Sequence, residues 1–524
     1  MNSDFILKNF NNETFEKPWW DKGRENRQVV YYIYPTHACN LRCDYCFYRD
    51  TKYQNSKMDD ETIEAVADFL LKWEPSKYIR IHFFGGEPFV VFDVMDKIVH
   101  KLVEKFTDSG KEISFSATTN GTLIRDKFDW ISSWFGSRKM RIKKDNKTYR
   151  VERPWNVNNK TIYVFYLEVN DKVTKILETD VWKREKIEEK IKSEFSQEDA
   201  NMFIDIYRSM ARPFLLSLDG PKHIHDKHRK QANGEGSWDL IPYKEILQQW
   251  PKIEVRPTFT TDMLPDEAFE AYMWLVKQGF TSIGTEPDYD NYGKPWTEEE
   301  IKAWEEFVYR LAWLWYELQE SGHYYYVKPI QEVISLFFEK GNDIPKHFLC
   351  GRGWNSMGIA ADGSIYPCQR WAGYRLDMNP KEYRLGHVKT GINLNRLFWV
   401  QQINRSEMIP PKKFDCLDCP MRSKCYGGCN AMNWYKFGTR FQIDENYCAI
   451  QQANFRAVMR FVFASEYYYN KILPKLKRNQ QEKRNVNCKN CYTCENCFTS
   501  QGGNVNIKAK RGKPPKIVIP KVLK

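Results

Sequence analysis

Two features that direct proteins into membranes or the secretory pathway are missing from this 524-residue sequence. No apolar segment reaches the roughly 18 residues that suggest a membrane-spanning helix. The N-terminal stretch MNSDFILKNFNNETF lacks the basic start and following apolar run of a signal peptide. We therefore expect a soluble, cytoplasmic protein that makes no membrane contact, and its length predicts about two to four domains.

Cysteine is absent from residues 47–349, although the chain has fourteen. In a cytoplasmic protein, clustered cysteines favour metal binding over a disulfide framework. The three clusters are Cys39, Cys43 and Cys46; then Cys350, Cys368, Cys416, Cys419, Cys425, Cys429 and Cys448; then Cys488, Cys491, Cys494 and Cys497.

Acidic residues are scarce in residues 466–524, which hold three acids against fourteen Lys and Arg. The net charge of +12 therefore belongs mostly to this tail, and the rest of the chain is nearly neutral. The run KAKRGKPPKIVIPKVLK has two interpretations. It is either a disordered, solvated tail or a contact for an anionic partner, namely an acidic peptide leader or nucleic acid.

From residue 29 to about residue 293, strand-like runs mostly alternate with amphipathic helical patterns. The candidate strands are 29–35, 79–84, 113–119, 213–219, 253–259 and 281–286. This order predicts an α/β fold with a parallel sheet, open or curled into a barrel. In such barrels the chemistry lies at the C-terminal ends of the strands. The segments CNLRCDYC (39–46) and GGEP (85–88) occupy that place after the first two strands.

Residues 138–211 interrupt the alternation because they are too long for a βα connection. They contain three or four short strand patterns followed by helical ones, which predicts a small inserted α+β module. We expect the module at the end of the barrel opposite the chemistry. It is either an elaboration of the fold or a substrate-docking module.

The segment CNLRCDYC supplies three thiols in eight residues. Three thiolates can hold three irons of a [4Fe–4S] cube and leave the fourth iron open. A zinc site needs four ligands, or three and a water, so spacing alone leaves zinc open. The C-x3-C-x2-C pattern with Tyr45 before the last cysteine resembles the signature of the radical SAM superfamily. The resemblance implies a partial (β/α)6 TIM-like barrel whose open iron binds S-adenosylmethionine. Reductive cleavage of that cofactor would yield a 5′-deoxyadenosyl radical.

Three further segments fit the same family: FFGGEP (83–88), TTNGTL (118–123) and LSLDGPKHIHDKHR (216–229). Glycines allow close approach of a ligand to the backbone, and a guanidinium suits a carboxylate. The alternative interpretation of Arg229 is a solvated charge on a helix. The resemblance implies cofactor contacts from Tyr45, Gly85, Gly86, Glu87, Asn120, Ser217 and Arg229.

The second cysteine group reads C-x12-G-x4-C, then C-x2-C-x5-C-x3-C, then a single cysteine. This order resembles the SPASM extension of radical SAM enzymes, which usually carries two auxiliary [4Fe–4S] clusters. The resemblance implies two ligand sets. One is Cys416, Cys419, Cys425 and Cys448, and the other is Cys350, Cys368 and Cys429.

Two positions depart from the sulfatase-maturing relatives. Ile344 stands where those enzymes have a further cysteine, so the second auxiliary cluster has an iron free for a substrate thiolate, water or another ligand. Gln369 stands where they have a catalytic Asp, and an amide cannot accept a proton at neutral pH. We therefore favour a thioether or C–C crosslink over formylglycine formation, and epimerisation stays open.

The third group, CKNCYTCENC, has the spacing C-x2-C-x2-C-x2-C, one residue short of a ferredoxin run. It predicts a further iron–sulfur cluster, a zinc knuckle, or a flexible redox or self-modified segment. The chain would thus carry three [4Fe–4S] clusters, or four with the tail.

Together these patterns divide the chain into six segments, two of which form one core. They are an N-terminal extension (1–27), the radical SAM core (28–137 and 212–330), the insert (138–211), the SPASM domain (331–465) and the basic tail (466–524). We predict an enzyme that modifies a peptide or protein side chain in ribosomal peptide maturation, with flavodoxin or ferredoxin as electron donor. The alternatives are radical modification of a nucleic-acid-linked or small-molecule substrate, and a non-catalytic, zinc-dependent nucleic-acid-binding protein.

Overall fold

The structure is a computed structural model of the chain. It describes residues 24–46, 56–154, 163–179, 183–322, 325–338, 350–373, 383–402, 407–421, 425 and 427–465. The predictions for Ile344, for residues 466–524 and for Cys488, Cys491, Cys494 and Cys497 lie outside these residues, as does most of the N-terminal extension.

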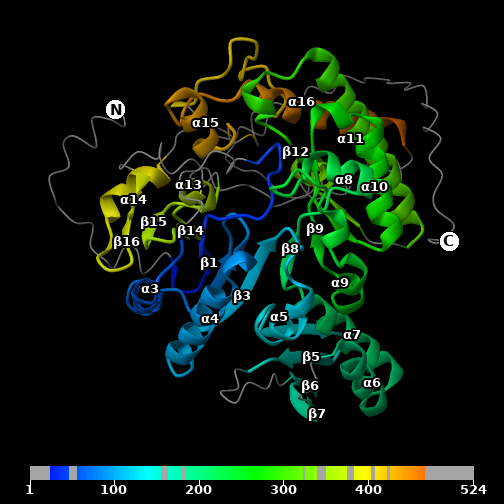
Figure 1. Ribbon diagram of the computed structural model, residues 1–524. Coiled ribbons are helices and arrows are strands. Elements are labelled where there is room, and N and C mark those ends of the chain that lie inside the picture. Colours follow the sequence, from blue (N-terminus) through cyan, green and yellow to red (C-terminus); the bar gives the residue numbers. More distant parts are fainter. Residues whose placement is uncertain are drawn as a thin grey trace, which may run out of the picture.

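A parallel sheet forms the centre of the molecule (Figure 1). Its described strands follow the order β11-β9-β8-β3-β2-β1. They are β1 (Gln28–Ile33), β2 (Tyr78–Phe83), β3 (Glu112–Thr119), β8 (Phe214–Leu216), β9 (Glu254–Val255) and β11 (Ser282–Ile283). All neighbours pair in parallel. This confirms the α/β class and is consistent with the partial barrel.

Two of the predicted strands are each split into a pair of short ones. Residues 253–259 form β9 and β10 (Thr258–Phe259), and residues 281–286 contain β11 and the start of β12 (Glu286–Pro287). Pro257, which has no N–H to donate, lies between β9 and β10 and interrupts the ladder. Strands β10 and β12 then pair with each other as a separate small sheet.

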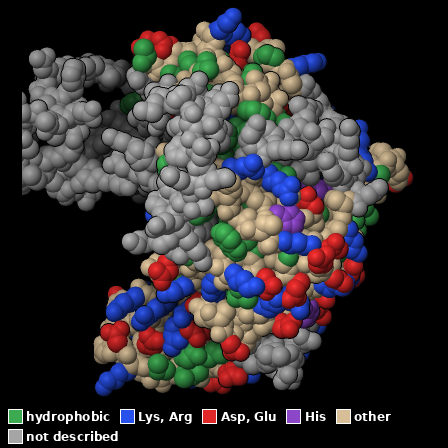
Figure 2. All heavy atoms as spheres, turned by 90° about the vertical axis from the view of Figure 1, so that its left-hand side faces the viewer, with side chains coloured by type: hydrophobic (Ala, Val, Ile, Leu, Met, Phe, Trp, Pro, Cys, Tyr) green, Lys and Arg blue, Asp and Glu red, His purple; other side chains and the backbone are tan. Residues whose placement is uncertain are grey.

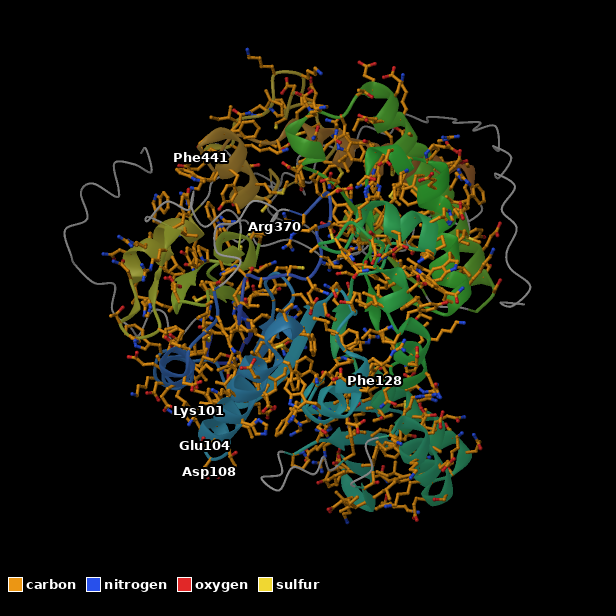
Figure 3. All side chains as sticks on the ribbon, viewed as in Figure 1. Lys101, Glu104, Asp108, Phe128, Arg370 and Phe441 are labelled. Atoms are coloured by element: carbon orange, nitrogen blue, oxygen red, sulfur yellow. The ribbon has the colours of Figure 1, made fainter. Side chains whose placement is uncertain are left out.

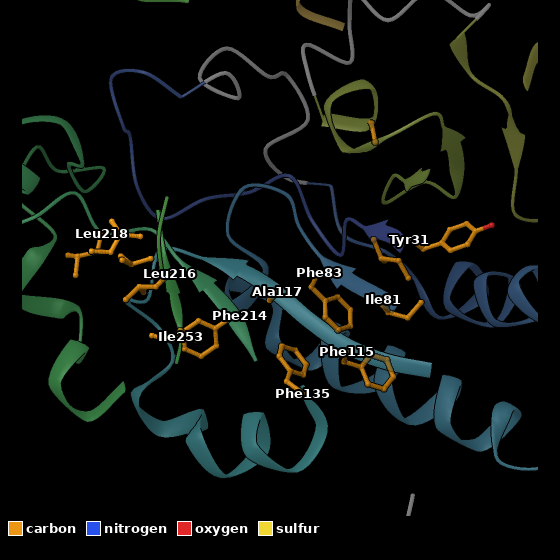
Figure 4. Close-up of a cluster of buried hydrophobic side chains, with 14 of the residues drawn as sticks. Tyr31, Ile81, Phe83, Phe115, Ala117, Phe135, Phe214, Leu216, Leu218 and Ile253 are labelled. Atoms are coloured by element: carbon orange, nitrogen blue, oxygen red, sulfur yellow. The ribbon is translucent and has the colours of Figure 1, made fainter. Parts of the chain in front are cut away.

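Helices pack on the outer face of the sheet. They are α3 (Asp60–Lys72), α4 (Phe92–Phe106), α5 (Phe128–Trp134), α8 (Lys222–His228), α9 (Tyr243–Gln249) and α10 (Asp266–Gln278). Helix α3 begins where Asp59 accepts a hydrogen bond from the Thr62 amide, as its sequence predicts. Figure 4 shows outward-facing strand residues in the core under these helices, including Phe83 and Phe115, whose rings stack on Phe135. This packing fixes the strands, so their inner faces line a defined space.

The insert is a separate small module with its own hydrophobic core. An antiparallel sheet of β4 (Lys139–Lys144), β5 (Lys147–Glu152), β6 (Tyr163–Val169) and β7 (Lys172–Thr179) packs on α6 (Arg184–Glu194) and α7 (Gln197–Met210). It lies at the bottom of Figure 1, where β8 begins, and basic and acidic side chains are interspersed on this lower part in Figure 2. The module therefore sits at the end of the barrel away from the loops that follow β1 and β2.

The cysteine-rich region packs on the barrel in two places. Strand β14 (Ser356–Ile359) pairs in parallel with β1, and β15 (Ser364–Tyr366), β16 (Gly386–His387) and β17 (Gly391–Ile392) continue the sheet. Helix α16 (Glu445–Ala464) lies along α11 (Glu298–Glu320), with a Trp304 Nε1 to Asn454 Oδ1 hydrogen bond of 2.8 Å. The aromatic stripe of α11 is thus core.

The remaining described elements are short. They are β13 (Tyr326–Val327), α12 (Lys328–Phe338), α13 (Gln369–Gly373), α14 (Leu394–Gln401), α15 (Asn430–Phe437), and the 3-10 helices Pro88–Val91, Arg125–Lys127, Trp238–Leu240, Thr261–Met263 and Asn291–Gly293. Across the part of the chain that the structure describes, no helix has the length and hydropathy to cross a bilayer.

Candidate active site

The loop that carries the first three cysteines, residues 36–46 (the cysteine loop), leaves the C-terminal end of β1. Backbone hydrogen bonds hold it from two sides. The Glu87 amide donates to the Ala38 carbonyl at 2.8 Å. The amides of Arg42 and Asp44 donate to the carbonyls of Lys230 and His228, at 2.6 and 3.1 Å. The end of β2 and the segment after α8 therefore fix where the three thiols lie.

Gly85 and Gly86 are required by the contact of β2 with the cysteine loop. A Cβ atom on Gly85 would lie 2.3 Å from the Thr36 carbonyl oxygen, and one on Gly86 would lie 2.1 Å from that of Ala38. Gly85 also has a φ of +142°, which favours glycine. Both glycines line the central cavity, but their closest neighbour is the loop itself.

Glu87 and Asn120 lie beside the cysteine loop and are joined to each other by a hydrogen bond. The buried Glu87 carboxylate accepts hydrogen bonds from the amides of Phe89 (3.1 Å) and Asn120 (2.7 Å) and from Thr119 Oγ1 (2.9 Å). Burial nevertheless raises the pKa of Glu87 to about 7. The Asn120 side chain donates to Asn40 Oδ1 at 2.9 Å. The Glu87 carboxylate thus joins the ends of β2 and β3, and the Asn120 side chain joins the end of β3 to the cysteine loop.

Tyr45 and Arg229 meet on Asp219, a residue that the sequence analysis did not identify. Arg229 donates from Nε and Nη2 to the two Asp219 carboxylate oxygens at 2.8 and 3.0 Å, and the Tyr45 hydroxyl donates to the same carboxylate. Burial opposes ionisation of Asp219, but the adjacent guanidinium holds its pKa below the usual value. Arg229 is 7% exposed, so its interpretation as a solvated helix charge is wrong.

The three thiols of the cysteine loop are half-buried and line the same cavity. Burial raises the pKa of Cys39 and of Cys43 to about 12 each, and Cys46 contributes to both shifts. Such thiols become thiolates only beside a positively charged metal centre. The environment therefore fits a metal-cluster ligand set better than a free nucleophile.

The seven auxiliary cysteines fall into two groups in space. The pKa of Cys368 is raised to about 12 by burial and then by Cys429 and Cys350. The pKa of Cys448 is raised by burial and then by its neighbours Cys425, Cys416 and Cys419. These are the two sets that the SPASM resemblance implies. Among the described residues, no three His, Cys, Asp or Glu side chains converge as a site for a single metal ion.

A cavity of about 800 Å³ joins the cysteine loop to the barrel interior. Cys39, Cys43 and Cys46 line it together with Gly85, Gly86, Glu87, Asn120, Tyr45, Ser217 and Arg229. The auxiliary region contributes Gln369, Arg370 and Met432. Figure 3 shows Arg370 near the middle of the molecule, between the cysteine-rich region and the barrel. All ten predicted residues of the first site thus face one space.

Sequence reasoning missed the polar residues inside the barrel. His82 is held between Ser116 Oγ and Thr118 Oγ1, each 2.9 Å from a ring nitrogen. Burial, followed by the charges of Arg80 and Arg256, lowers its pKa to about 3, so the ring is neutral and both nitrogens are used. The signal in the sequence was alternation of polar with apolar residues in IRIHFF and ISFSATT.

Comparison with known proteins agrees with this geometry. Residues 33–133 match the model of the Radical SAM superfamily. The chain is 24% identical over 412 residues to the cysteine-type anaerobic sulfatase-maturating enzyme of Clostridium novyi (strain NT), which covers 75% of this chain and 84% of that enzyme.

Solved structures share the fold. Native anSMEcpe with bound AdoMet has a TM-score of 0.55 at 19% identity, over 83% of this chain and 98% of that one. Native anSMEcpe with bound AdoMet and Cp18Cys peptide has a TM-score of 0.54 at 18% identity, over 87% of this chain and 100% of that one. The radical SAM family implies a [4Fe–4S] cluster and S-adenosylmethionine, and the cysteine loop at the mouth of the cavity fits both. The chain is an enzyme whose residues 33–133 match the Radical SAM superfamily, and it is similar over most of its length to the anaerobic sulfatase-maturating enzymes.

Proposed function

We propose that this enzyme abstracts a hydrogen atom from a peptide or protein side chain and thereby forms a thioether or C–C crosslink. Cys39, Cys43 and Cys46 would hold an iron–sulfur cluster, and S-adenosylmethionine bound beside it would supply the hydrogen-abstracting radical chemistry. The observation that carries the proposal is the cavity, since it faces both the cysteine loop and the auxiliary region. A peptide substrate is supported by the sulfatase-maturating relatives and by the related structure that contains Cp18Cys peptide.

The residues around the loop have distinct roles in binding the cofactor. Asp219 occupies two of the five N–H donors of Arg229, which leaves three for the cofactor carboxylate. The Ser217 hydroxyl lines the same cavity and is a further donor. The backbone of Gly85 and Gly86 borders the space for the cofactor amino group, and Tyr45 supports Arg229 through Asp219.

The auxiliary cysteines would hold clusters, one of which would bind the substrate. We assign one cluster to Cys416, Cys419, Cys425 and Cys448 and another to Cys350, Cys368 and Cys429. The second has three protein thiolates, so an open iron would bind a substrate thiol and lower its pKa. Gln369 lines the cavity and follows Cys368 in the sequence. With the thiol bound to iron, the side chain at this position does not have to act as a base. A flavodoxin or ferredoxin would supply electrons.

Deuterium transfer tests this proposal. The anaerobically reconstituted enzyme, S-adenosylmethionine and dithionite would be incubated with peptides that contain Cβ-deuterated cysteine or uniformly deuterated neighbouring residues. We expect 5′-deoxyadenosine to acquire deuterium and the labelled peptide to lose three mass units on thioether coupling, one deuterium and one proton, where the unlabelled peptide loses two. Cofactor cleavage with no deuterium transfer from any peptide, but with transfer from a nucleic-acid-linked or small-molecule substrate, would replace the peptide assignment.

A further inference from the structure

The inner face of the barrel carries basic side chains. Strand alternation turns Arg80 and His82 of β2 inward, and Glu254 and Arg256 at β9 likewise line the cavity. Parallel barrels usually fill this space with bulky apolar residues. A charged interior costs free energy unless a partner compensates it.

Arg80 has no such partner within the described parts of the chain. It lies in register with Val30 of β1 and Ser114 of β3, and all three line the cavity. No hydrogen bond or ion pair joins its guanidinium to a described residue. The Ser114 hydroxyl, which can donate a hydrogen bond, is beside it in the register and also faces the cavity.

Arg256 is only loosely paired. Its Nη2 lies 3.3 Å from Glu254 Oε1, and the two side chains are 46% and 43% exposed to the cavity and solvent. Burial is the largest cause of the low pKa of His82, and the charges of Arg80 and Arg256 follow. Both guanidinium groups line the cavity that His82 also lines, and both act on its ring, so this part of the cavity combines two positive charges with the Glu254 carboxylate and a neutral imidazole.

The chemistry of this volume favours a carboxylate ligand. A guanidinium presents parallel N–H donors that match the two oxygens of a carboxylate, and such charge-assisted bonds are strong away from bulk water. Along β2 at about 3.3 Å per residue, Arg80 lies roughly 16 Å below Gly85. A peptide that reaches both the cysteine loop and this place must therefore span about that distance inside the barrel.

We propose that Arg80 and Arg256 form a carboxylate-binding subsite inside the barrel, which takes an acidic side chain or the C-terminal carboxylate of the substrate peptide near its reacting residue. This inference rests on the proposed function and specifies its substrate class as a carboxylate-bearing peptide.

Peptide pools distinguish the two sources of the carboxylate. Each pool has a central cysteine among random uncharged residues. The first carries one Glu at each flanking position in turn and an amidated C-terminus, the second has Gln in place of Glu, and the third has Gln and a free C-terminus. Dissociation constants would be measured by fluorescence anisotropy on the reconstituted full-length enzyme with S-adenosylmethionine and no reductant.

The wild type should bind the first or the third pool about 10- to 100-fold more tightly than the neutral pool, as expected for charge-assisted hydrogen bonds. Arg80→Gln should abolish the preference without changing the affinity for the neutral pool, and Arg80→Lys should retain part of it. Arg125→Gln, which alters an exposed pair with Glu245, is the matched control and should change nothing.

Equal binding of all pools, binding of none, or a preference that survives in Arg80→Gln would overturn the subsite. Adding dithionite separates this result from the proposed function. Tight binding of a carboxylate pool with no hydrogen transfer would contradict the function and leave the subsite standing. Modification of the neutral pool as efficiently as the carboxylate pools would support the proposed function and contradict the subsite.

Discussion

The cysteine loop and the auxiliary cysteines both bring thiols together, but different contacts hold the two sets in place. The loop draws its three thiols from residues 39–46, and backbone hydrogen bonds from Glu87 and from residues 228–230 fix it. The auxiliary thiols come from residues 350–448, and side chains contact their sulfurs. Arg352 Nη1 donates to Cys350 Sγ at 3.0 Å, and Gln452 Nε2 donates to Cys419 Sγ at 3.7 Å. The first site therefore depends on the barrel, and the second on long-range packing of the whole chain.

Gly86→Ala should have the largest effect, because it disrupts the cysteine loop and spares the auxiliary cysteines. The new Cβ would collide with the Ala38 carbonyl and displace the cysteine loop, while the auxiliary region keeps its contacts. We expect 5′-deoxyadenosine formation to fall at least about 100-fold, since misplacing a reacting group by about 1 Å has such an effect. Iron content should fall by about four per chain, one cube. Gly110→Ala is the control: its φ of +73° also disfavours alanine, but its Cβ meets nothing within 4 Å and the residue lies just before β3, away from the cysteine loop. Normal turnover in Gly86→Ala would show that the loop tolerates movement.

Asp219→Asn removes the charge that Arg229 and Tyr45 share. A buried guanidinium without its partner costs about 3–5 kcal/mol, so the free energy of unfolding should fall by about that amount. The affinity for S-adenosylmethionine, measured by equilibrium dialysis, should fall as well. Asp126→Asn alters an exposed pair with Lys127 and should change stability by less than about 1 kcal/mol. Equal effects of the two variants would contradict the central role of Asp219.

Acid should weaken the barrel through its buried histidines. Burial lowers the pKa of His225 to about 4 from an ordinary 6.5, so the unfolded chain binds the extra proton between these values. Stability that is present above pH 6.5 is therefore lost as the pH falls, by about 2 kcal/mol at pH 5. Chemical denaturation of His225→Gln should show a flatter pH dependence than wild type.

Gln369→Ala should have the smallest effect. The side chain lines the cavity, but an amide does not accept a proton at neutral pH, so peptide turnover should stay within a few-fold. Losing a working general base would cost about 10²- to 10⁴-fold. A loss of that size in the initial rate would assign Gln369 a catalytic role and remove the reason to invoke an open iron.

Local patterns predicted the parts of the structure that depend on local sequence. The strands and the inserted module agree with the periodicity of the sequence. Asp219 was missed because its partners, Tyr45 and Thr258, come together only in the folded barrel.

The barrel interior was missed for a related reason. Arg80, His82 and Arg256 lie in strands whose apolar residues dominate the pattern, and the sequence does not reveal which face surrounds a cavity. The two glycines were found correctly, but their nearest contact is the cysteine loop rather than a ligand. Spacing indicates candidate ligands, and the residues that support them are found from the three-dimensional contacts.

The central claim is that the cysteine loop alone activates S-adenosylmethionine. The most direct measurement is the yield of 5′-deoxyadenosine from Cys43→Ala under strong reductant, compared with wild type by chromatography. The account predicts no product above the enzyme-free background in this variant, while the auxiliary iron stays bound. Cleavage at the wild-type rate in Cys43→Ala would contradict it and would move the chemistry to the auxiliary cysteines.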